Sequence, residues 1–509
     1  MTTTVLELQN ITKRFGQLTA NDDISLKLER GEILAFLGEN GAGKTTLMNI
    51  LFGHYVPDEG RVFVKGAEIP QGKPRAAIDA GVGMVHQHFT LAPNLTVLEN
   101  IITGTESLWK LKSAHGAARA KIAQIAERFG LKVDPDMRLG DLSVGEQQRV
   151  EILKALYNDA DMLILDEPTA VLTTQEAENL FATLKEMARQ GLSLIFISHK
   201  LHEVMSAADR VVVLRGGKLV AERKASETSK EELAELMVGR RVSRPSRAAA
   251  TPGETLLEAK NVTVVEDGAT RLTDLGFHLR AGETLGIIGV SGNGQAALGR
   301  LVSGLSQPAS GSLVMFGQTV TKFDPRQFVA EGVGRIPEDR NAEGAIGDLT
   351  LWENAVLERV RDPQFSNGLL VNRAAAREFT DRIIKDFDVR GGTPDSRIRL
   401  LSGGNMQKLI LGRNLETAPR ILIAAQPTRG LDEGAVAAIH ARILEARAKG
   451  AAVLLISEDL DEIIGLADRV QAIVKGRLSP PIDAGEANAQ RLGLMMAGEW
   501  RTNLTKGLN

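Results

Sequence analysis

A glycine-rich stretch with one lysine and one threonine has the residue types needed to bind a polyphosphate. It consists of Gly38, Glu39, Asn40, Gly41, Ala42, Gly43, Lys44 and Thr45, followed by Thr46. The spacing fits the P-loop pattern of a glycine, four residues and then Gly-Lys-Thr. Backbone N–H groups and a helix N-terminus face the phosphates in such a loop. The lysine reaches the β- and γ-phosphates, and the threonine hydroxyl helps to hold Mg²⁺. An apolar run at 33–37 and a helical pattern at 46–51 favour this loop over a chance glycine-rich turn.

Two carboxylates end a second apolar run. Asp166 and Glu167 directly follow residues 162–165. At a strand tip beside a P-loop, Asp166 is suited to holding Mg²⁺, and Glu167 to orienting or deprotonating the attacking water. An acidic strand end on its own is more often a solvated turn, but the upstream P-loop makes that interpretation the weaker one.

Three further side chains are candidate site residues because they accompany the P-loop and the acidic strand end. His199 follows the apolar run 193–198, and a neutral imidazole there would hydrogen-bond the γ-phosphate and the attacking water. Gln87 would place an amide oxygen on Mg²⁺ or water, and Phe15 would stack on an adenine ring. Taken singly, a strand-capping histidine and a core phenylalanine are the commoner outcomes.

Composition limits the class of protein. The 509 residues are enough for two or more domains. A net charge of −3 gives no overall basic surface for nucleic acid or anionic lipid. The absence of cysteine excludes disulfides and thiolate metal sites. The N-terminus lacks the pattern of a signal peptide, and no apolar run is long enough to cross a bilayer. We therefore expect a soluble, cytoplasmic protein that reaches a membrane only through partner subunits.

The second half of the chain repeats the first. The offset between matching segments is 251 early in the repeat (282 minus 31) and 259 later (402 minus 143). We predict two α/β domains at 1–243 and 253–509, joined by a linker at 244–252. Each should contain a mostly parallel sheet with helices on both faces. Charged, alanine-rich stretches at 117–129 and 374–387 predict a helical subdomain inserted in each domain.

The chemistry of the first copy is missing from the second. The glycines Gly289, Gly292 and Gly294 remain, but Gln295 and Ala296 replace the lysine and threonine. The other replacements are Ala425 for Asp166, Gln426 for Glu167, Glu458 for His199, Glu338 for Gln87 and Glu266 for Phe15. The three glutamates would add negative charge near a polyanion. The replacements remove the catalytic roles together, so this copy is predicted not to hydrolyse a nucleotide, and whether it binds one stays open.

The ordered motifs resemble an ATP-binding cassette. The diagnostic segment is Leu-Ser-x-Gly, which ordinary P-loop proteins lack; it is present at 142–145 and again at 401–404. The resemblance covers nearly the whole chain and implies two tandem cassettes that use ATP and Mg²⁺. In that family, two cassettes pair head to tail, and the Leu-Ser-x-Gly helix of one covers the γ-phosphate held by the P-loop of the other. A helix N-terminus with serine and glycine N–H groups suits that task.

The two Leu-Ser-x-Gly segments are unequal. The second copy keeps Ser402, Gly403 and Gly404, followed by Asn405, whereas the first has Val144 between Ser143 and Gly145. Head-to-tail pairing therefore implies one competent composite ATP site, formed by the first P-loop and the second Ser-Gly-Gly segment. It also implies one degenerate site formed by the remaining parts.

Three classes of cassette protein are candidates. Chromosome and DNA-repair types carry a long coiled coil, which this chain lacks. Ribosome-associated types resemble two intact cassettes with a long, charged linker. The importer class fits best, and it implies two transmembrane permeases, an extracytoplasmic solute-binding receptor and a position at the cytoplasmic face of the inner membrane. Tandem cassettes resemble the ribose-type importers, and the segments 85–89, 292–295 and 424–427 are more similar to the nucleoside importers that use a lipoprotein receptor. Simple sugars are the alternative substrate.

Overall fold

The computed structural model divides the chain into two compact units. The first unit comprises Met1–Val242 and Asp432–Gly434, and the second comprises Ser243–Leu431 and Ala435–Asn509. The structure describes residues 4–16, 18–86, 90–105, 115–169, 172, 174–198, 200–239, 247–248, 251–368 and 370–500. The domain limits expected at 1–243, 244–252 and 253–509 stay predictions.

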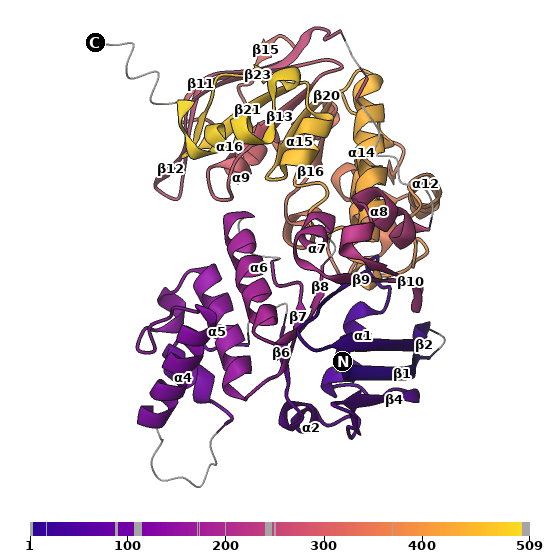
Figure 1. Ribbon diagram of the computed structural model, residues 1–509. Coiled ribbons are helices and arrows are strands. Elements are labelled where there is room, and N and C mark those ends of the chain that lie inside the picture. The colour runs from indigo at the N-terminus through magenta and orange to yellow at the C-terminus, as the bar shows by residue number, and fades with distance from the viewer. Residues whose placement is uncertain are drawn as a thin grey trace, which may run out of the picture. The chain divides into compact units, whose positions relative to one another are not determined.

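The first unit is built on a six-stranded sheet in the order β10-β9-β3-β8-β7-β6 (Figure 1). The strands are β3 (Ile33–Leu37), β6 (Val82–Val85), β7 (Met162–Asp166), β8 (Ser193–Ile197), β9 (Arg210–Arg215) and β10 (Lys218–Lys224). All neighbours are parallel except β9 and β10. Parallel order brings the carboxyl ends of β3, β8 and β7 to one edge, where ligands of open α/β sheets bind.

The strands of this sheet are buried on both faces. Ile33, Ala35 and Leu37 of β3 belong to one hydrophobic core, while Leu34 and Phe36 belong to another. Alternate side chains of a strand point to opposite faces, so a strand covered on both sides must be apolar throughout. The continuous apolar runs of the sequence have this cause.

Eight α-helices accompany the described strands of the first unit. They are α1 (Lys44–Phe52), α2 (Pro74–Asp79), α3 (Val97–Ile102), α4 (His115–Phe129), α5 (Val144–Tyr157), α6 (Thr174–Arg189), α7 (Leu201–Ala207) and α8 (Lys230–Val238). Helices α3, α4 and α5 contact one another as a helical layer away from β1 and β2 (Figure 1). The helix expected at 117–129 is α4, which begins two residues earlier.

A second, antiparallel sheet in the first unit was not anticipated. Its order is β2-β1-β4-β5, with β1 (Thr4–Phe15), β2 (Leu18–Glu29), β4 (Glu59–Val64) and β5 (Ala67–Glu68). Leu26 and Leu28 are buried in β2 while Ser25 and Lys27 are exposed, the period-two pattern of a strand with one face in water.

The second unit repeats both sheets. Its antiparallel sheet has the order β12-β11-β14-β15, with β11 (Thr255–Glu266), β12 (Ala269–Arg280), β14 (Ser310–Met315) and β15 (Gln318–Thr319). The other sheet runs β16-β19-β20-β13-β21-β22, and β23 pairs with β21. These strands are β13 (Thr284–Ile288), β16 (Val333–Ile336), β19 (Ile421–Ala425), β20 (Ala452–Ser457), β21 (Arg469–Val474), β22 (Arg477–Leu478) and β23 (Ile482–Asp483).

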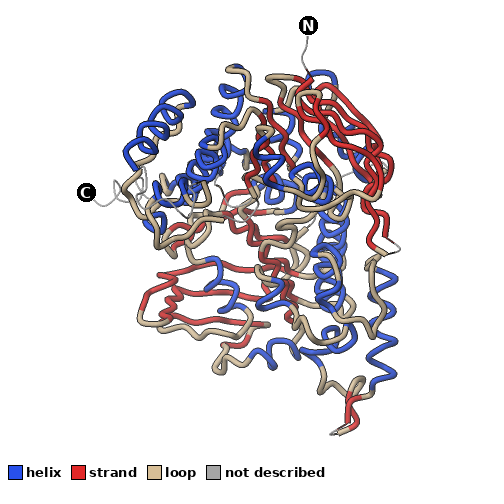
Figure 2. The backbone as a smooth tube through the Cα atoms, turned by 90° about the horizontal axis from the view of Figure 1, so that it is seen from below, coloured by secondary structure: helices blue, strands red, loops and turns tan. Residues whose placement is uncertain are grey.

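The helices of the second unit follow the same order as those of the first. They are α9 (Gln295–Val302), α10 (Pro325–Ala330), α11 (Leu351–Val356), α12 (Arg373–Asp386), α13 (Gly403–Leu415), α14 (Glu433–Ala448), α15 (Leu460–Leu466) and α16 (Ala489–Ala497). A small hairpin, β17 (Ser366–Asn367) with β18 (Leu370–Val371), precedes α12. Figure 2 shows the strands in red and the helices in blue. The predicted α/β class, with mostly parallel sheets and flanking helices, is confirmed in both units.

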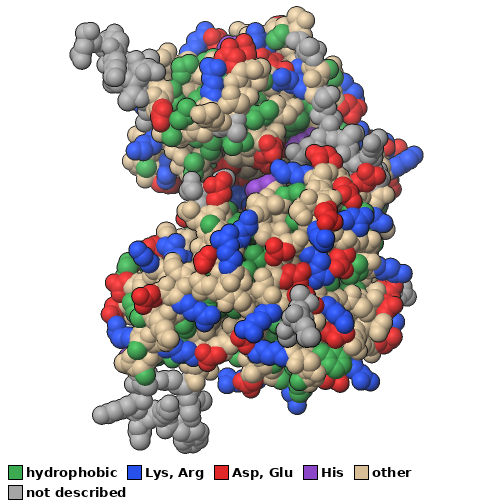
Figure 3. Space-filling view, in the orientation of Figure 1, with side chains coloured by type: hydrophobic (Ala, Val, Ile, Leu, Met, Phe, Trp, Pro, Cys, Tyr) green, Lys and Arg blue, Asp and Glu red, His purple; other side chains and the backbone are tan. Residues whose placement is uncertain are grey.

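Among the described residues, none of the helices is both long and apolar enough to cross a bilayer. On the face drawn in Figure 3, basic and acidic side chains are interspersed. This mixture matches the small net charge of −3.

A buried ion-pair cluster fastens β13 and β21 of the second unit. The Glu283 side chain is only 2 % exposed. It accepts two hydrogen bonds from Arg280, at 2.8 and 2.6 Å, and two from Arg469, at 2.7 and 3.0 Å. Burial alone would raise the pKa of Glu283, but these hydrogen bonds and charges lower it to about 2. The carboxylate is therefore ionised in the folded protein at every ordinary pH.

We predict that Glu283→Gln lowers the melting temperature at neutral pH and that the difference shrinks on acidification. The folded pKa of about 2 lies below the ordinary value of 4.5. The stabilisation by this carboxylate is therefore complete above pH 4.5 and is lost as the pH falls toward 2. Thermal melting of both proteins between pH 7 and pH 2 measures it, and a difference that stays constant with pH would contradict the assignment.

Candidate nucleotide site

The sheet of the first unit brings the predicted phosphate loop and carboxylates to one edge. The loop 38–43 follows β3, and Asp166 is the last residue of β7. Strand β8 lies between them and pairs with both, with Ile197 opposite Asp166. Segments more than 120 residues apart in the sequence therefore meet at one edge.

Lys44 is the first residue of α1, and its side chain bonds to the carbonyl groups at the start of the loop. Its side chain is buried, and its Nζ donates to the carbonyl oxygens of Gly38 at 2.6 Å and Glu39 at 3.0 Å. Burial lowers the pKa of Lys44, and the nearby charges of Glu167 and Asp166 act in the opposite direction. The ammonium group is thus held in the loop by carbonyls and balanced by carboxylates.

Gly43 is required by the geometry of the turn into α1. Its φ is 96°, in the left-handed region. A Cβ at this position would lie 2.1 Å from the carbonyl oxygen of Ala20 in β2. Both the backbone conformation and the space exclude a side chain.

Asp166 and Glu167 differ in environment. Asp166 is 6 % exposed, and burial and the neighbouring Glu167 raise its pKa to about 6 although Lys44 acts against this. Glu167 has a φ of 47°, unusual for a side-chain-bearing residue, and its N–H donates to Ile197 O at 3.1 Å. Strained backbone of this kind is concentrated at functional sites. Asp166 is a carboxylate that a nearby cation would stabilise in the ionised form.

Not all predicted residues fall in the described part of the chain. Gln87 and His199 lie outside the described residues. Phe15 ends β1, is 45 % exposed and packs edge-on against Tyr55 with ring centroids 5.7 Å apart. Its side chain is therefore available to an adenine ring instead of being part of the core. Thr45 is exposed and Thr46 partly exposed at the start of α1.

In the Ser-x-Gly segment of the first unit, the Glu146 carboxylate accepts hydrogen bonds from Ser143. Ser143 is the N-cap of α5, and its Oγ donates to Glu146 Oε2 at 2.8 Å. The backbone N–H of Ser143 donates to the same oxygen at 2.9 Å. These bonds lower the pKa of Glu146, so a negative charge sits at the helix N-terminus. Val144 is 39 % exposed, and a Cβ at Gly145 would lie 2.9 Å from Glu176 Oε1, so the Glu176 side chain would have to shift.

The matching segment of the second unit has the opposite hydrogen-bond direction. Ser402 is the N-cap of α13, and its Oγ accepts from Asn405 Nδ2 at 3.0 Å and from Asn405 N at 3.5 Å. A hydroxyl that accepts twice keeps its own hydrogen for another acceptor. No carboxylate occupies this position, since residue 405 is an asparagine. Gly403 and Gly404 form the first turn of α13. This segment is suited to an anion, and the first is not.

The degenerate loop of the second unit keeps its shape without the lysine. Gly292 and Gly294 have φ of 84° and 114°, close to the 85° of Gly41 and 96° of Gly43. Gln295 is buried, and its Nε2 donates to Val290 O at 2.8 Å, while its Oε1 has no hydrogen-bond partner. Val290 corresponds to Glu39, so the amide of Gln295 replaces one of the two carbonyl contacts of Lys44. The first residue of this loop is Gly289. A Cβ at Gly289 would lie 3.1 Å from Gln295 Nε2, so the glycine leaves space for the glutamine side chain.

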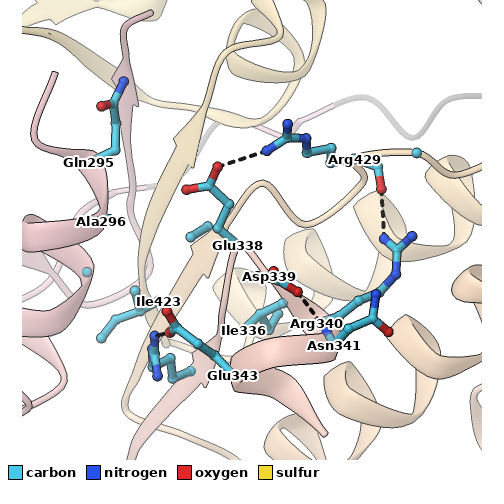
Figure 4. Close-up of a pocket in the computed structure, with 14 residues that line it drawn as sticks. Gln295, Ala296, Ile336, Glu338, Asp339, Arg340, Asn341, Glu343, Ile423 and Arg429 are labelled. Atoms are coloured by element: carbon cyan, nitrogen blue, oxygen red, sulfur yellow. Dashed lines mark hydrogen bonds and ion pairs between the residues drawn. The ribbon is translucent and has the colours of Figure 1, made fainter. Parts of the chain in front are cut away.

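A cavity of about 450 Å³ adjoins this loop (Figure 4). Ala296 and Ala425, which replace Thr45 and Asp166, line it. Loss of the larger polar side chains thus coincides with an open space. Gln426 follows with a φ of 48°, the same strained conformation as Glu167.

Two of the three glutamates that replace first-unit site residues, Glu266 and Glu338, form ion pairs with arginines. Glu266 forms a bidentate ion pair with Arg300. Glu338 pairs with Arg429 at 2.9 Å, as Figure 4 shows. Burial raises the pKa of Glu458. Glu266 and Glu338 are thus each paired with an arginine that the motifs do not include, and the effect of the three glutamates on a bound polyanion stays a prediction.

One buried carboxylate was not predicted from the sequence. Glu203 of α7 is 2 % exposed and accepts hydrogen bonds from Thr169 Oγ1 at 2.6 Å and Ser198 Oγ at 2.7 Å. The signal was present in the repeat, because Glu462, Thr428 and Ser457 stand at the same offset of 259 from these three residues (462 minus 203).

Comparison with known proteins places these features in a family. The ABC transporter family model matches residues 21–170 and 272–429, one segment in each unit. The chain belongs to the ABC transporter family. It is an ATPase of that family with two cassettes, as the motifs predicted.

Full-length relatives accompany the family match. The nucleoside import ATP-binding protein NupA of Lactococcus lactis is 43% identical, covering 97% of this chain and 98% of the relative. The guanosine import ATP-binding protein NupO of Bacillus subtilis is 43% identical over 97% of each chain. The glucose import ATP-binding protein TsgD13 of Haloferax volcanii is 42% identical over 99% of this chain and 97% of the relative. A solved complex of the archaeal ribosome recycling factor aABCE1 with the stalk protein aP1 covers 96% of this chain with a TM-score of 0.62 and 18% identity, a likeness of fold alone.

We predict that Asn405→Glu lowers ATP turnover by about tenfold or more, the scale of losing one donor to a developing anion. The new carboxylate would take the Ser402 hydroxyl hydrogen, as Glu146 takes that of Ser143, and would repel phosphate. The capping box it forms stabilises a helix N-terminus, so misfolding would not explain a loss. Glu146→Asn is the matched control and should change steady-state turnover little. Equal effects of the two substitutions would contradict the prediction.

Proposed function

We propose that this chain is the energy-coupling ATPase of an importer and that it hydrolyses ATP at one site only. The observation that carries the proposal is the asymmetry between the units. The first has a buried lysine balanced by two carboxylates, and the second has Gln295, Ala425 and Gln426 in the same places.

In the proposed reaction, the first unit binds the triphosphate. The N–H groups of the loop Gly38, Glu39, Asn40, Gly41, Ala42 and Gly43 surround the phosphates, and Lys44 transfers its hydrogen bonds from the loop carbonyls to them. Phe15 stacks on adenine. Thr45, Gln87 and Asp166 would hold Mg²⁺, which neutralises phosphate charge when bound. The raised pKa of Asp166 fits this role. Burial and the charge of Glu167 disfavour the ionised form of Asp166, and a bound cation would stabilise that form.

Glu167 acts on the water that attacks the γ-phosphate. Its carboxylate accepts a proton from that water, and His199 holds the water and the γ-phosphate in line. The position of Glu167 supports the assignment, since its N–H donates to Ile197 O at 3.1 Å directly after Asp166 at the end of β7. Ser402, Gly403, Gly404 and Asn405 complete the site by donating hydrogen bonds to the transferring phosphoryl group. Ser143 and Gly145 belong with the degenerate loop to the second, inactive site.

The importer assignment rests on the named relatives. NupA, NupO and TsgD13 all carry the words import ATP-binding protein in their names. By analogy, the chain works with two transmembrane permeases and an extracytoplasmic receptor, at the cytoplasmic face of the inner membrane.

The proposed substrate is a nucleoside. Two relatives at 43% identity are named for nucleoside and guanosine import, and they agree with the motif resemblance. Simple sugars are the second candidate, because the relative named for glucose import is 42% identical. Relatives named for ribose import are more distant, at 36% and 35%.

We predict that Lys44→Ala or Glu167→Gln lowers ATP turnover by about 100-fold or more, since each removes a group that acts on the reacting phosphate or water. Gln295→Ala, at the position equivalent to Lys44, should retain nearly full turnover. Phosphate release from the assembled transporter measures all three. A Gln295→Ala protein as inactive as Lys44→Ala would overturn the single-site assignment.

We predict that a strain lacking this chain loses uptake of labelled nucleosides and keeps uptake of glucose and ribose. Re-expression of the wild-type chain should restore nucleoside uptake, whereas Glu167→Gln should not. Loss of sugar uptake with normal nucleoside uptake would replace the substrate assignment with the second candidate.

A further inference from the structure

Glu203 connects the two segments of the first unit that carry the proposed catalytic groups. Thr169, which donates to Glu203 at 2.6 Å, lies two residues after Glu167. Ser198 donates to the other carboxylate oxygen at 2.7 Å, and Lys200 Nζ lies 3.2 Å from Glu203. Ser198 and Lys200 flank His199 in the sequence. One buried carboxylate is therefore bonded to the neighbours of both catalytic groups.

We propose that Glu203 is a positioning residue that fixes the Glu167 segment against the His199 segment for ATP hydrolysis. The inference rests on the proposed function, in which Glu167 and His199 act together on the attacking water. Glu203 itself has no role in contacting ATP.

The contacts are strong enough for this role. Thr169 and Ser198 are each 3 % exposed, so both hydroxyls donate to the Glu203 carboxyl group away from water. A buried acceptor that loses such donors is left unsatisfied, which is unfavourable. Lys200 closes the ring, because its Nζ donates to Thr169 O at 3.4 Å and its N–H to Ser198 Oγ at 3.0 Å. These bonds join the segment that follows Glu167 to the segment that contains Ser198 and Lys200.

The backbone alone does not explain this connection. A hydrogen bond from Glu167 N to Ile197 O, at 3.1 Å, already joins the ends of β7 and β8. It lies at the start of both segments and leaves Thr169 and Lys200 beyond it, while Ser198 N donates to Phe36 O of β3 at 3.4 Å. The side chains of Thr169, Ser198 and Lys200 contact Glu203, which joins the two segments to each other beyond that backbone bond.

The second unit provides an internal comparison. Glu462, also 2 % exposed, still accepts from Thr428 Oγ1 at 2.7 Å. Its other described partner is His440 Nε2 of α14 at 3.0 Å. In the first unit the position of His440 is Phe181, which cannot donate. The carboxylate of the unit without catalytic groups thus bonds to a helix, and that of the unit with them bonds beside His199.

The test compares Glu203→Gln with the matched control Glu462→Gln in the full chain assembled with its permeases. We expect Glu203→Gln to lower kcat by about tenfold or more while KM for ATP changes by less than about threefold, because the P-loop is untouched. Glu462→Gln should keep the wild-type kcat. Thermal melting of both variants shows whether they lose stability to the same extent, as a purely structural role would require.

Three outcomes would overturn the inference. They are a folded Glu203→Gln protein with wild-type kcat, equal losses of kcat in both variants, and a loss in which KM rises in proportion. If Glu203→Gln does not fold, Ser198→Ala replaces it in the test, because this substitution removes one bond and leaves the carboxylate. A fall in kcat at unchanged KM supports the inference, and an unchanged kcat overturns it.

The same assay separates this inference from the proposed function. Lys44→Ala and Glu167→Gln that retain turnover would refute the proposed function itself. If they abolish turnover and Glu203→Gln does not affect it, only the role of Glu203 is refuted. Combining Thr169→Val with Ser198→Ala should lower kcat no further than Glu203→Gln does, because the changes act on one connection.

Discussion

The buried ammonium group of Lys44 is the interaction on which the first unit's site depends. An amine removed from water is stable in its charged form only with acceptors and opposite charges nearby. The loop provides carbonyl oxygens at 2.6 and 3.0 Å, and the end of β7 provides the charges of Asp166 and Glu167. Both depend on the sheet order, since β8 holds β3 and β7 on either side of itself. The left-handed turn at Gly43 completes the arrangement by starting α1 at the lysine.

The second unit has the same loop without that charge. Gln295 donates to one of the two equivalent carbonyls, so the loop keeps its conformation with a neutral side chain. Carboxylates at 425 and 426, which are partly buried positions, would then lie without their cation, and an unpaired charge shielded from water costs free energy. Alanine and glutamine at these positions avoid that cost. The joint loss of lysine and carboxylates therefore has one electrostatic cause, while the strained φ of 48° at Gln426 persists because the backbone geometry is unchanged.

The sequence predicted the fold class, which is confirmed, and the glycine-rich loop after β3, because both depend on local patterns. Apolar runs such as residues 33–37 identify buried parallel strands, and glycine spacing identifies the loop. The antiparallel sheets were missed although β2 shows the period-two pattern, because attention to continuous apolar runs overlooks half-exposed strands. The ion pairs of Glu266 with Arg300 and Glu338 with Arg429 were also missed. Such pairs join residues 34 and 91 positions apart, and motif comparison contains no information on contacts at that distance.

The most informative differences between the units are in side-chain hydrogen bonds, which differ in direction or partner at equivalent positions of the two units. Ser143 and Ser402 cap equivalent helices, yet one hydroxyl donates to a carboxylate and the other accepts from an amide. Glu203 and Glu462 are equally buried, yet one is bonded beside His199 and the other to a histidine of α14. A fold-level likeness cannot distinguish these cases, because both units place these residues on helices in the same order along the chain. The chemical assignment of each unit therefore depends on which atoms keep a free donor or a free charge. By that criterion, the loop of the first unit and the capping serine of the second are the parts suited to a phosphate.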